Sequence, residues 1–215
     1  MIINHKKNEK IVKLCHSLHS SRFLSCFSSV IVAALNIIFE KWGSFANQNQ
    51  WNISGEPCSG AAIAYSIALD TDGYSPFIKC DCSYNKNTLC HIIGMSFHAL
   101  EVDGVIPDEL WSLNSLIELD FSVNRLSRQL PKELGMLFES QSLNIERNNF
   151  SGPLPSVLGK LTKLKDLAIG TNNFSSPLPS ELSKLTKLKT LYMDSAGVSG
   201  EIPSSFANLK NLELL

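Results

Sequence analysis

Five prolines in this 215-residue chain are spaced by 24 residues each time, and each follows an isoleucine or a leucine. They are Pro107, Pro131, Pro155, Pro179 and Pro203. Counting back from them gives a recurrent frame, L-x-x-L-x-L-x-x-N-x-L-S-G-x-I-P, which is best preserved in residues 116–131 and 164–179. A fixed period of this length is typical of chains that fold as stacked repeats, so it constrains the fold more than any other feature.

The leucines of the frame predict one short strand in each repeat. Alternating side chains of a strand point to opposite faces, so the leucines face inward and the intervening residues face out. No repeat buries its leucines alone, and stacking therefore builds a parallel sheet on the concave side. Asn124, Asn148 and Asn172 follow the strands, where a side-chain amide can bond backbone groups at the bend. Leu100 and Ala196 interrupt this asparagine ladder at its two ends.

Three departures from the frame predict local strain. Gly104, Gly152 and Gly200 suit a tight backbone conformation, but Arg128 and Ser176 stand at the same position in two other repeats. We expect strain or a small change of shape there. Ser140 replaces a frame leucine, which predicts a packing defect.

Four cysteines lie before the repeats: Cys58, Cys80, Cys82 and Cys90. They allow three pairings. A Cys80–Cys82 bond would close a very small, strained ring, so two pairings remain, and we favour Cys58–Cys80 with Cys82–Cys90. A zinc site that adds His91 is disfavoured because its spacing lacks a C-x₂₋₄-C element. Disulfides indicate an oxidising compartment. Three N-x-S acceptors for glycosylation, at Asn52, Asn149 and Asn173, also favour secretion.

Residues 1–32 form a leader. Five basic residues and one glutamate lie within residues 1–22, and the 17 residues from Phe23 to Phe39 carry no charge. This order resembles a secretory signal. A non-standard leader from a mis-placed start and a membrane anchor are the alternatives. The apolar run also continues into an amphipathic helix, because Leu35, Ile38, Phe39 and Trp42 follow a helical period.

The repeat frame resembles the plant extracellular class of leucine-rich repeats. The stretches NQNQWNISGEPCSGAAI (47–63), PFIKCDCSYN (76–85) and SGEIPSSFANLKNLE (199–213) look like the amino-terminal ectodomain of plant leucine-rich-repeat receptor-like serine/threonine kinases that carry a malectin-like domain. The resemblance implies an α/β solenoid with short parallel strands on the concave face. Residues 33–91 would form a disulfide-closed cap, and residues 92–215 about five coils plus a truncated sixth.

The same resemblance implies a recognition module on the extracellular face of the plasma membrane or in the apoplast. Its partner would be a peptide, a protein or a co-receptor, and the chain would stop before malectin-like, transmembrane and kinase segments. Membrane contact would come only through those segments or the amino-terminal apolar run. A secreted inhibitor of cell-wall hydrolases is the alternative, and a non-functional gene fragment is another. The sequence holds no protein-kinase or hydrolase motif, so we expect no enzyme and no cofactor or metal. Net charge is −1, which does not favour nucleic acid.

The outward positions of the strands and of the turns after them supply the candidate binding face. Its residues are Glu118, Asp120, Asn144, Glu146, Arg147, Asp166, Tyr192 and Asp194, accompanied by Ser96, His98, Ser122 and Thr190. Five acidic residues against one arginine predict a mildly acidic face that prefers polar or basic partners, and a merely solvated surface is the alternative.

Lysines gather elsewhere, in GKLTKLKDL and SKLTKLKTL. They are Lys160, Lys163, Lys165, Lys184, Lys187 and Lys189. Because the two sets are 24 residues apart, they predict a basic ridge. The simpler interpretation is that the ridge keeps an exposed face soluble, and the alternative is a contact with an anionic glycan or lipid.

Overall fold

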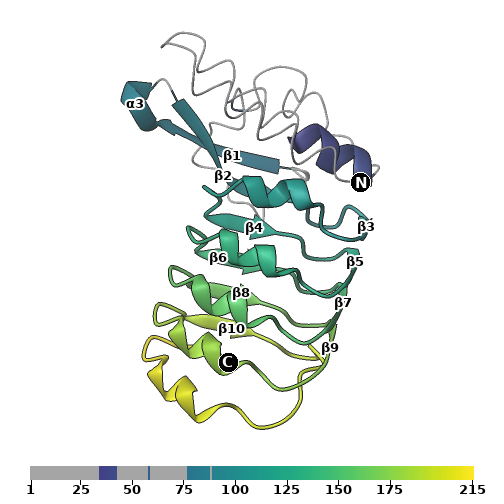
Figure 1. Cartoon of the computed structure of the whole chain (residues 1–215), viewed down its shortest axis with the longest axis vertical. Coiled ribbons are helices and arrows are strands. Elements are labelled where there is room, and N and C mark those ends of the chain that lie inside the picture. Colours follow the sequence, from purple (N-terminus) through teal and green to yellow (C-terminus); the bar gives the residue numbers. More distant parts are fainter. Residues whose placement is uncertain (1–33, 43–57, 59–76, 88) are drawn as a thin grey trace.

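Alternating leucines on short strands line up one coil above the next along the molecule. The computed structural model describes residues 34–42, 58, 77–87 and 89–215. The leader, residues 1–32, and Asn52 lie outside these residues. Each of the first four coils runs through a strand, a turn, a second short strand and a 3₁₀ helix, and the fifth lacks the second strand (Figure 1).

The strand of the frame builds a six-stranded sheet. Its order is β1 (Phe77–Ser83), β2 (Leu89–Ser96), β4 (Glu118–Asp120), β6 (Ser142–Asn144), β8 (Asp166–Ala168) and β10 (Thr190–Tyr192). β1 pairs antiparallel with β2, and every later pair is parallel. The register is one full repeat, since Leu119 lies opposite Leu143 and Leu143 opposite Leu167. The parallel sheet expected from the leucine pattern is therefore confirmed.

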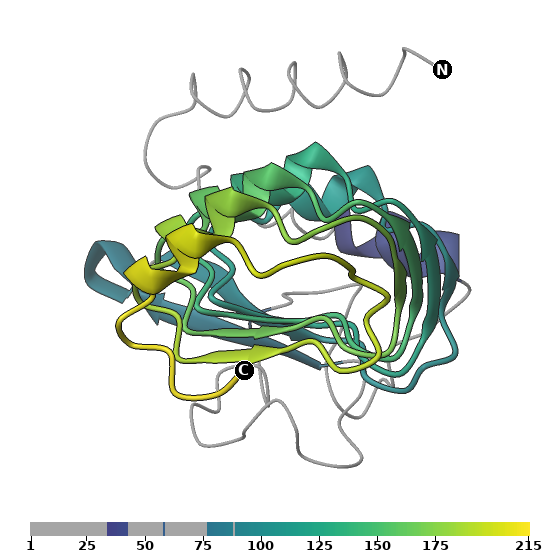
Figure 2. The same ribbon diagram turned by 90° about the horizontal axis from the view of Figure 1, so that it is seen from below.

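A second sheet, which the sequence does not predict, follows the turn in the first four coils. It contains β3 (Asp103–Gly104), β5 (Arg125–Arg128), β7 (Asn149–Gly152) and β9 (Asn173–Phe174), again in parallel order. These strands run along the edge opposite the loops that lead into the six-stranded sheet (Figures 1 and 2).

A 3₁₀ helix begins directly after each frame proline. The helices are η2 (Asp108–Ser112), η3 (Lys132–Met136), η4 (Ser156–Lys160), η5 (Ser180–Lys184) and η6 (Ser204–Asn208). The prolines hold φ between −56° and −75°, which the pyrrolidine ring fixes, and so set where each helix starts. The helices pack closely: a Cβ built on Gly159 of η4 would lie 2.4 Å from the carbonyl oxygen of Glu181 in η5.

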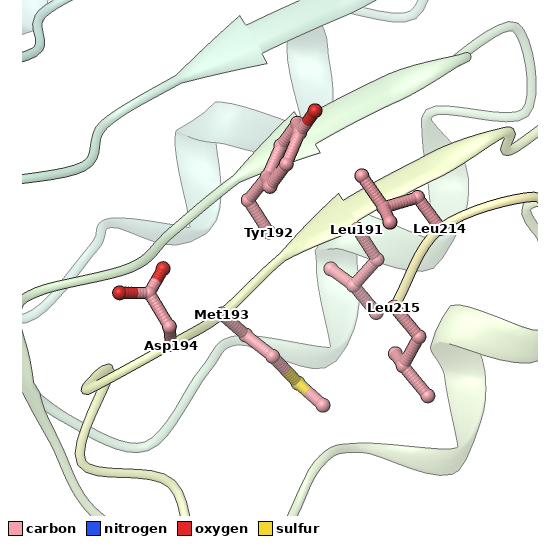
Figure 3. Close-up of a pocket in the computed structure, with 6 residues that line it drawn as sticks. All are labelled: Leu191, Tyr192, Met193, Asp194, Leu214 and Leu215. Atoms are coloured by element: carbon pink, nitrogen blue, oxygen red, sulfur yellow. The ribbon is translucent and has the colours of Figure 1, made fainter.

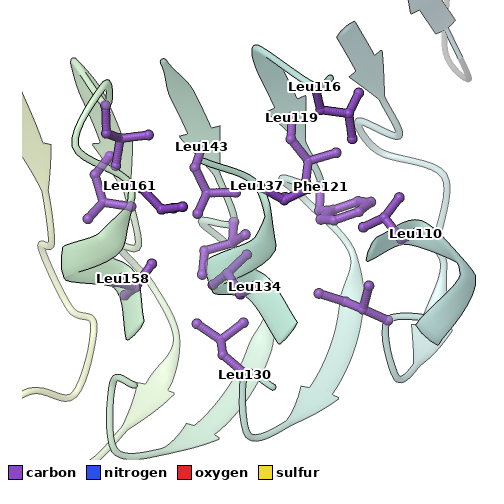
Figure 4. Close-up of a cluster of buried hydrophobic side chains, with 14 of the residues drawn as sticks. Leu110, Leu116, Leu119, Phe121, Leu130, Leu134, Leu137, Leu143, Leu158 and Leu161 are labelled. Carbon is purple, nitrogen blue, oxygen red and sulfur yellow. The ribbon is translucent and has the colours of Figure 1, made fainter. Parts of the chain in front are cut away.

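The core is one continuous column between the sheets and the 3₁₀ helices (Figure 4). Frame leucines such as Leu116, Leu164 and Leu188 are completely buried. Phenylalanines stack in it as well, Phe97 on Phe121 at a centroid distance of 5.5 Å and Phe150 on Phe174 at 6.4 Å. Burial of this column is the main favourable contribution to folding, because apolar area removed from water stabilises by about 25 cal/mol per Å².

The asparagine ladder forms as predicted. Asn148 accepts a bond from the backbone N–H of Leu126 at 3.0 Å and donates to the carbonyl of Phe121 at 2.9 Å. Asn124 and Asn172 make the equivalent bonds one coil earlier and one coil later. Each asparagine thereby ties its own turn to the preceding coil, because a single amide group supplies both an acceptor and donors.

Backbone strain occurs where the sequence predicts it. Gly104, Gly152 and Gly200 have φ between +75° and +86°, and Arg128 and Ser176 adopt the same region at +72° and +77°. A side chain is unfavourable in this conformation.

Ser140 also lies where expected, in the leucine position of its coil. It is buried, and its hydroxyl donates to the Ser142 carbonyl at 3.3 Å. The hydrogen bond satisfies the hydroxyl, but the side chain contributes less apolar contact than the leucines above and below it.

The first coil is covered by a cap. Residues 34–42 are helical, and the predicted stripe faces the core, with Leu35, Ile38 and Phe39 buried. Trp42 packs edge-on against Phe97 at 5.0 Å, and its indole N–H donates to the Val105 carbonyl at 3.1 Å. The apolar residues at the end of the uncharged run therefore belong to the folded domain.

Two disulfides close the cap, Cys58–Cys80 and Cys82–Cys90, which is the pairing favoured from sequence. They leave no thiol for a zinc site among these four residues. β2 serves both the cap hairpin and the six-stranded sheet, so the boundary expected after residue 91 falls inside this strand. Among the described residues, no helix has the length and apolar character needed to cross a membrane.

Candidate functional site

The outward residues of the six-stranded sheet form two rows across the coils. One row contains Glu118, Ser142, Asp166 and Thr190, and the other Asp120, Asn144, Ala168 and Tyr192. We call this surface, together with the turn residues Glu146, Arg147 and Asp194 that follow the strands, the sheet face. Because parallel pairing fixes the strands, the rows are rigid and their spacing is set by the backbone.

Several polar side chains of the sheet face are already engaged. The carboxylate of Asp120 accepts from the backbone N–H of Ser122 at 2.7 Å, and Asn144 accepts from that of Glu146 at 3.1 Å. Asp166 accepts a bond from the Thr190 hydroxyl. Asp120 and Asn144 therefore shape the turns, and a mutation there would change the backbone as well as the surface.

Glu118, Asp166 and Asp194 carry the negative charge of the sheet face without a cation beside them among the described residues. Glu118 is half-buried, and Asp166 and Asp194 are exposed. The single basic residue, Arg147, pairs with its neighbour Glu146 at 3.9 Å. The acidic character expected from sequence is thus present, and the outward carboxylates are distributed over four coils.

Two of the residues expected on this surface are not accessible. Ser96 and Ser122 are 1% and 2% exposed, which corrects their assignment as outward contacts. Ser122 lies within 2.9 Å of the His98 Nδ1 atom, so the exposed imidazole lies against its hydroxyl. Alternation along the strand gives the direction of a side chain, but it does not show what covers it.

A pocket of about 360 Å³ opens beside β10, and no pattern in the sequence predicts it (Figure 3). Leu191, Met193, Leu214 and Leu215 supply apolar walls, and Tyr192 and Asp194 supply an aromatic ring and a carboxylate. Tyr192 is 46% exposed. The pocket therefore joins an apolar surface to the acidic sheet face and suits a side chain that has an aliphatic stem and a basic end.

The candidate glycosylation residues lie away from the sheet face. Asn149 and Asn173 are exposed on β7 and β9 of the second sheet, and Asn52 is outside the described residues. Sugars on the second sheet would leave the sheet face uncovered.

Comparison with known proteins identifies the repeats. The family model described as Leucine Rich Repeat matches residues 115–137, 141–161 and 187–209, which correspond to three of the coils. The chain carries a leucine-rich-repeat domain. Two probable LRR receptor-like serine/threonine-protein kinases of Arabidopsis thaliana are each 49% identical to it over 83 residues. That match covers 39% of this chain and 8% of either kinase.

Solved structures share the fold of the leucine-rich-repeat domain. A plant ice-binding protein superposes with a TM-score of 0.67 at 27% identity, covering 83% of this chain and 52% of that one. The ectodomain of the Arabidopsis thaliana receptor kinase GASSHO1/SCHENGEN3, solved with CASPARIAN STRIP INTEGRITY FACTOR 2, superposes with a TM-score of 0.56 at 26% identity, covering 64% and 19%. The relatives and several structural neighbours are thus plant receptor kinases.

Proposed function

We propose that this leucine-rich-repeat domain is the extracellular recognition module of a plant receptor kinase and that it binds a peptide or protein through the sheet face. The kinase relatives support the receptor class, and the GASSHO1/SCHENGEN3 ectodomain, solved with its bound factor, supports a peptide or protein partner. A co-receptor is a second partner of the same class. Malectin-like, transmembrane and kinase segments belong to the complete receptor in this proposal.

The two disulfides support the extracellular location. Cystine bonds persist in oxidising compartments and are rare in the cytosol. The exposed acceptor residues Asn149 and Asn173 are accessible to the glycosylation machinery of the secretory pathway. We therefore place the domain outside the cell or at the outer face of the plasma membrane.

The observation that carries the proposal is the acidic sheet face. Glu118, Asp166 and Asp194 project from a rigid sheet and have no compensating cation among the described residues. Complementary charge speeds encounter and excludes like-charged competitors. The partner therefore presents lysine or arginine side chains.

A displayed library of random peptides tests this proposal. We expect selection on the purified domain to enrich peptides rich in lysine and arginine. The triple variant E118K/D166K/D194K should lose those peptides, whereas the control D103K/D108K/E201K, which changes charge equally at exposed residues off the sheet face, should retain them. Asp120 is left intact because it holds the turn at Ser122. Enrichment of acidic peptides, or equal loss in the control, would contradict the proposal.

A further inference from the structure

One edge of the solenoid is basic although the chain as a whole is not. The last residues of the 3₁₀ helices and the loops that follow them carry seven exposed lysines and only two glutamates, Glu139 and Glu213. We call these lysines the lysine flank; they are Lys160, Lys163, Lys165, Lys184, Lys187, Lys189 and Lys210. The flank is therefore net positive in a chain whose net charge is −1.

The lysines lie in register because hydrogen bonds tie neighbouring coils together along this flank. The backbone N–H of Lys189 donates to the Lys165 carbonyl at 2.7 Å, and that of Lys165 to the Gln141 carbonyl at 2.8 Å. Side chains at equivalent positions also meet, since Lys163 Nζ lies 2.5 Å from Glu139 Oε2, 24 residues earlier. Equivalent lysines in the next two coils are therefore neighbours.

This register stacks like charges. Lys160 lies one coil from Lys184, Lys163 from Lys187 and Lys165 from Lys189, and the backbone of the last pair is joined directly by a hydrogen bond. Within the described part of the chain, Lys160, Lys165, Lys184 and Lys187 have no ion-pair partner. Like charges placed directly opposite each other are destabilising. A ligand with negative charges repeated along a line would relieve the repulsion of all three pairs.

The apolar residues of the flank restrict the kind of ligand further. The leucines between the lysines are fully buried, and the exposed apolar side chains of these rows are Met136 and Phe138, one coil before the first lysines. Phe138 is 51% exposed and continues the row of Thr162 and Thr186 by one coil. Its ring presents a flat apolar surface on which a pyranose ring can stack, and the two threonines present hydroxyl groups.

We propose that the lysine flank binds a linear, carboxylate-bearing polysaccharide that lies along the solenoid axis. The identical KLTKLK segments of two successive coils offer the same chemistry at each step, as a polymer of repeating sugars requires. The candidate glycosylation residues Asn149 and Asn173 are on the second sheet, at the opposite edge (Figure 2), so their sugars would not cover this site. The site is separate from the acidic sheet face, and the proposal does not depend on the peptide partner.

Binding of the purified chain to polygalacturonate, measured at about 50 and about 200 mM NaCl, tests the proposal because screening weakens such contacts. The variant K160Q/K165Q/K184Q/K187Q should bind about tenfold or more weakly at low salt, as loss of four polyelectrolyte contacts implies. The control K86Q/R125Q/R128Q/K132Q removes the same charge elsewhere and should stay within about twofold. Both variants should unfold at the temperature of the parent or above it.

Four further measurements separate the classes of ligand. F138A should weaken binding without changing its salt dependence, and fully methyl-esterified polygalacturonate should bind much less than the acid form. Polyglutamate that binds as tightly as polygalacturonate would show a general polyanion site and overturn the assignment to a polysaccharide. Vesicles containing phosphatidylserine that retain the chain when polygalacturonate does not would overturn it in favour of a membrane. An equal loss in the control variant would also overturn it.

Discussion

The side-chain amide of Asn148 donates to the backbone carbonyl of Phe121, 27 residues earlier, at 2.9 Å. The same amide also donates to the carbonyls of Ile145 and Glu146, and its oxygen accepts from Leu126. One side chain therefore satisfies backbone groups in two coils at the point where both turn.

Replacing Asn148 by alanine should lower the free energy of unfolding by about 3 kcal/mol, because several partly buried backbone groups lose their partner at once. Denaturant unfolding followed by circular dichroism measures the change. Asn114→Ala, at an exposed position on a loop, is the control and should shift stability by less than about 0.5 kcal/mol. An equal loss of unfolding free energy in the two variants would show that the side-chain hydrogen bonds of Asn148 do not stabilise the domain.

Gly159→Ala should destabilise the domain by about 3 kcal/mol, the upper range for overpacking, because the new Cβ would meet the Glu181 carbonyl at 2.4 Å. Ser183 occupies the same place in the next coil and already carries a side chain, so Ser183→Ala is the matched control. Thermal melts of the two variants make the comparison. A Gly159→Ala protein as stable as the parent would mean that the 3₁₀ helices can separate freely.

Ser176→Gly should raise the free energy of unfolding by about 1 kcal/mol, since Ser176 holds φ at +77° and glycine adopts this region without a steric penalty. Arg128→Gly should act in the same direction. Ser156→Gly, at a residue of η4 with negative φ, should have the opposite sign and lower stability by about 0.5–1 kcal/mol. Chemical denaturation distinguishes these signs.

The two disulfides should contribute unequally. Loop closure predicts about 3.4 kcal/mol for the Cys58–Cys80 bond and about 2.5 kcal/mol for Cys82–Cys90, because the first closes a longer loop; the separations are 22 and 8 residues. The double variant C58S/C80S should therefore melt at a lower temperature than C82S/C90S. Mass spectrometry of the alkylated parent should find all four thiols blocked, and free thiols at these residues would contradict the cap described above.

Sequence reasoning reached much of this fold because its strongest signals are periodic. The proline spacing fixes the coil length, and the leucine alternation fixes which strand residues face the core. Asn124, Asn148 and Asn172 could be assigned to the turns because an amide can both donate and accept hydrogen bonds. In the same way, Gly104 predicts a positive φ at this position of the repeat, and Arg128, which occupies the position one coil later, also has a positive φ.

Other features have no comparable signal. The second sheet consists of strands such as β3 and β9, only two residues long, and pairing between coils creates them rather than local preference. Val123 and Thr171 take positive φ before the ladder asparagines, although β-branched residues disfavour it, because the stacked coils impose the turn. The burial of Ser96 and the pocket beside Tyr192 likewise arise from packing that no single repeat encodes.

The asparagine ladder stops at Leu100 and Ala196. At the later end, the Phe174 N–H bonds the Ala196 carbonyl at 3.0 Å, where the preceding coil uses the side chain of Asn172. At this turn the coils of β2, β4, β6 and β8 are therefore joined through asparagine side chains, whereas the coils of β8 and β10 are joined through the main chain. Under mechanical load along its axis, the domain should therefore separate first between the coils of β8 and β10, and the rupture force should rise when the load reaches Asn172 and Asn148.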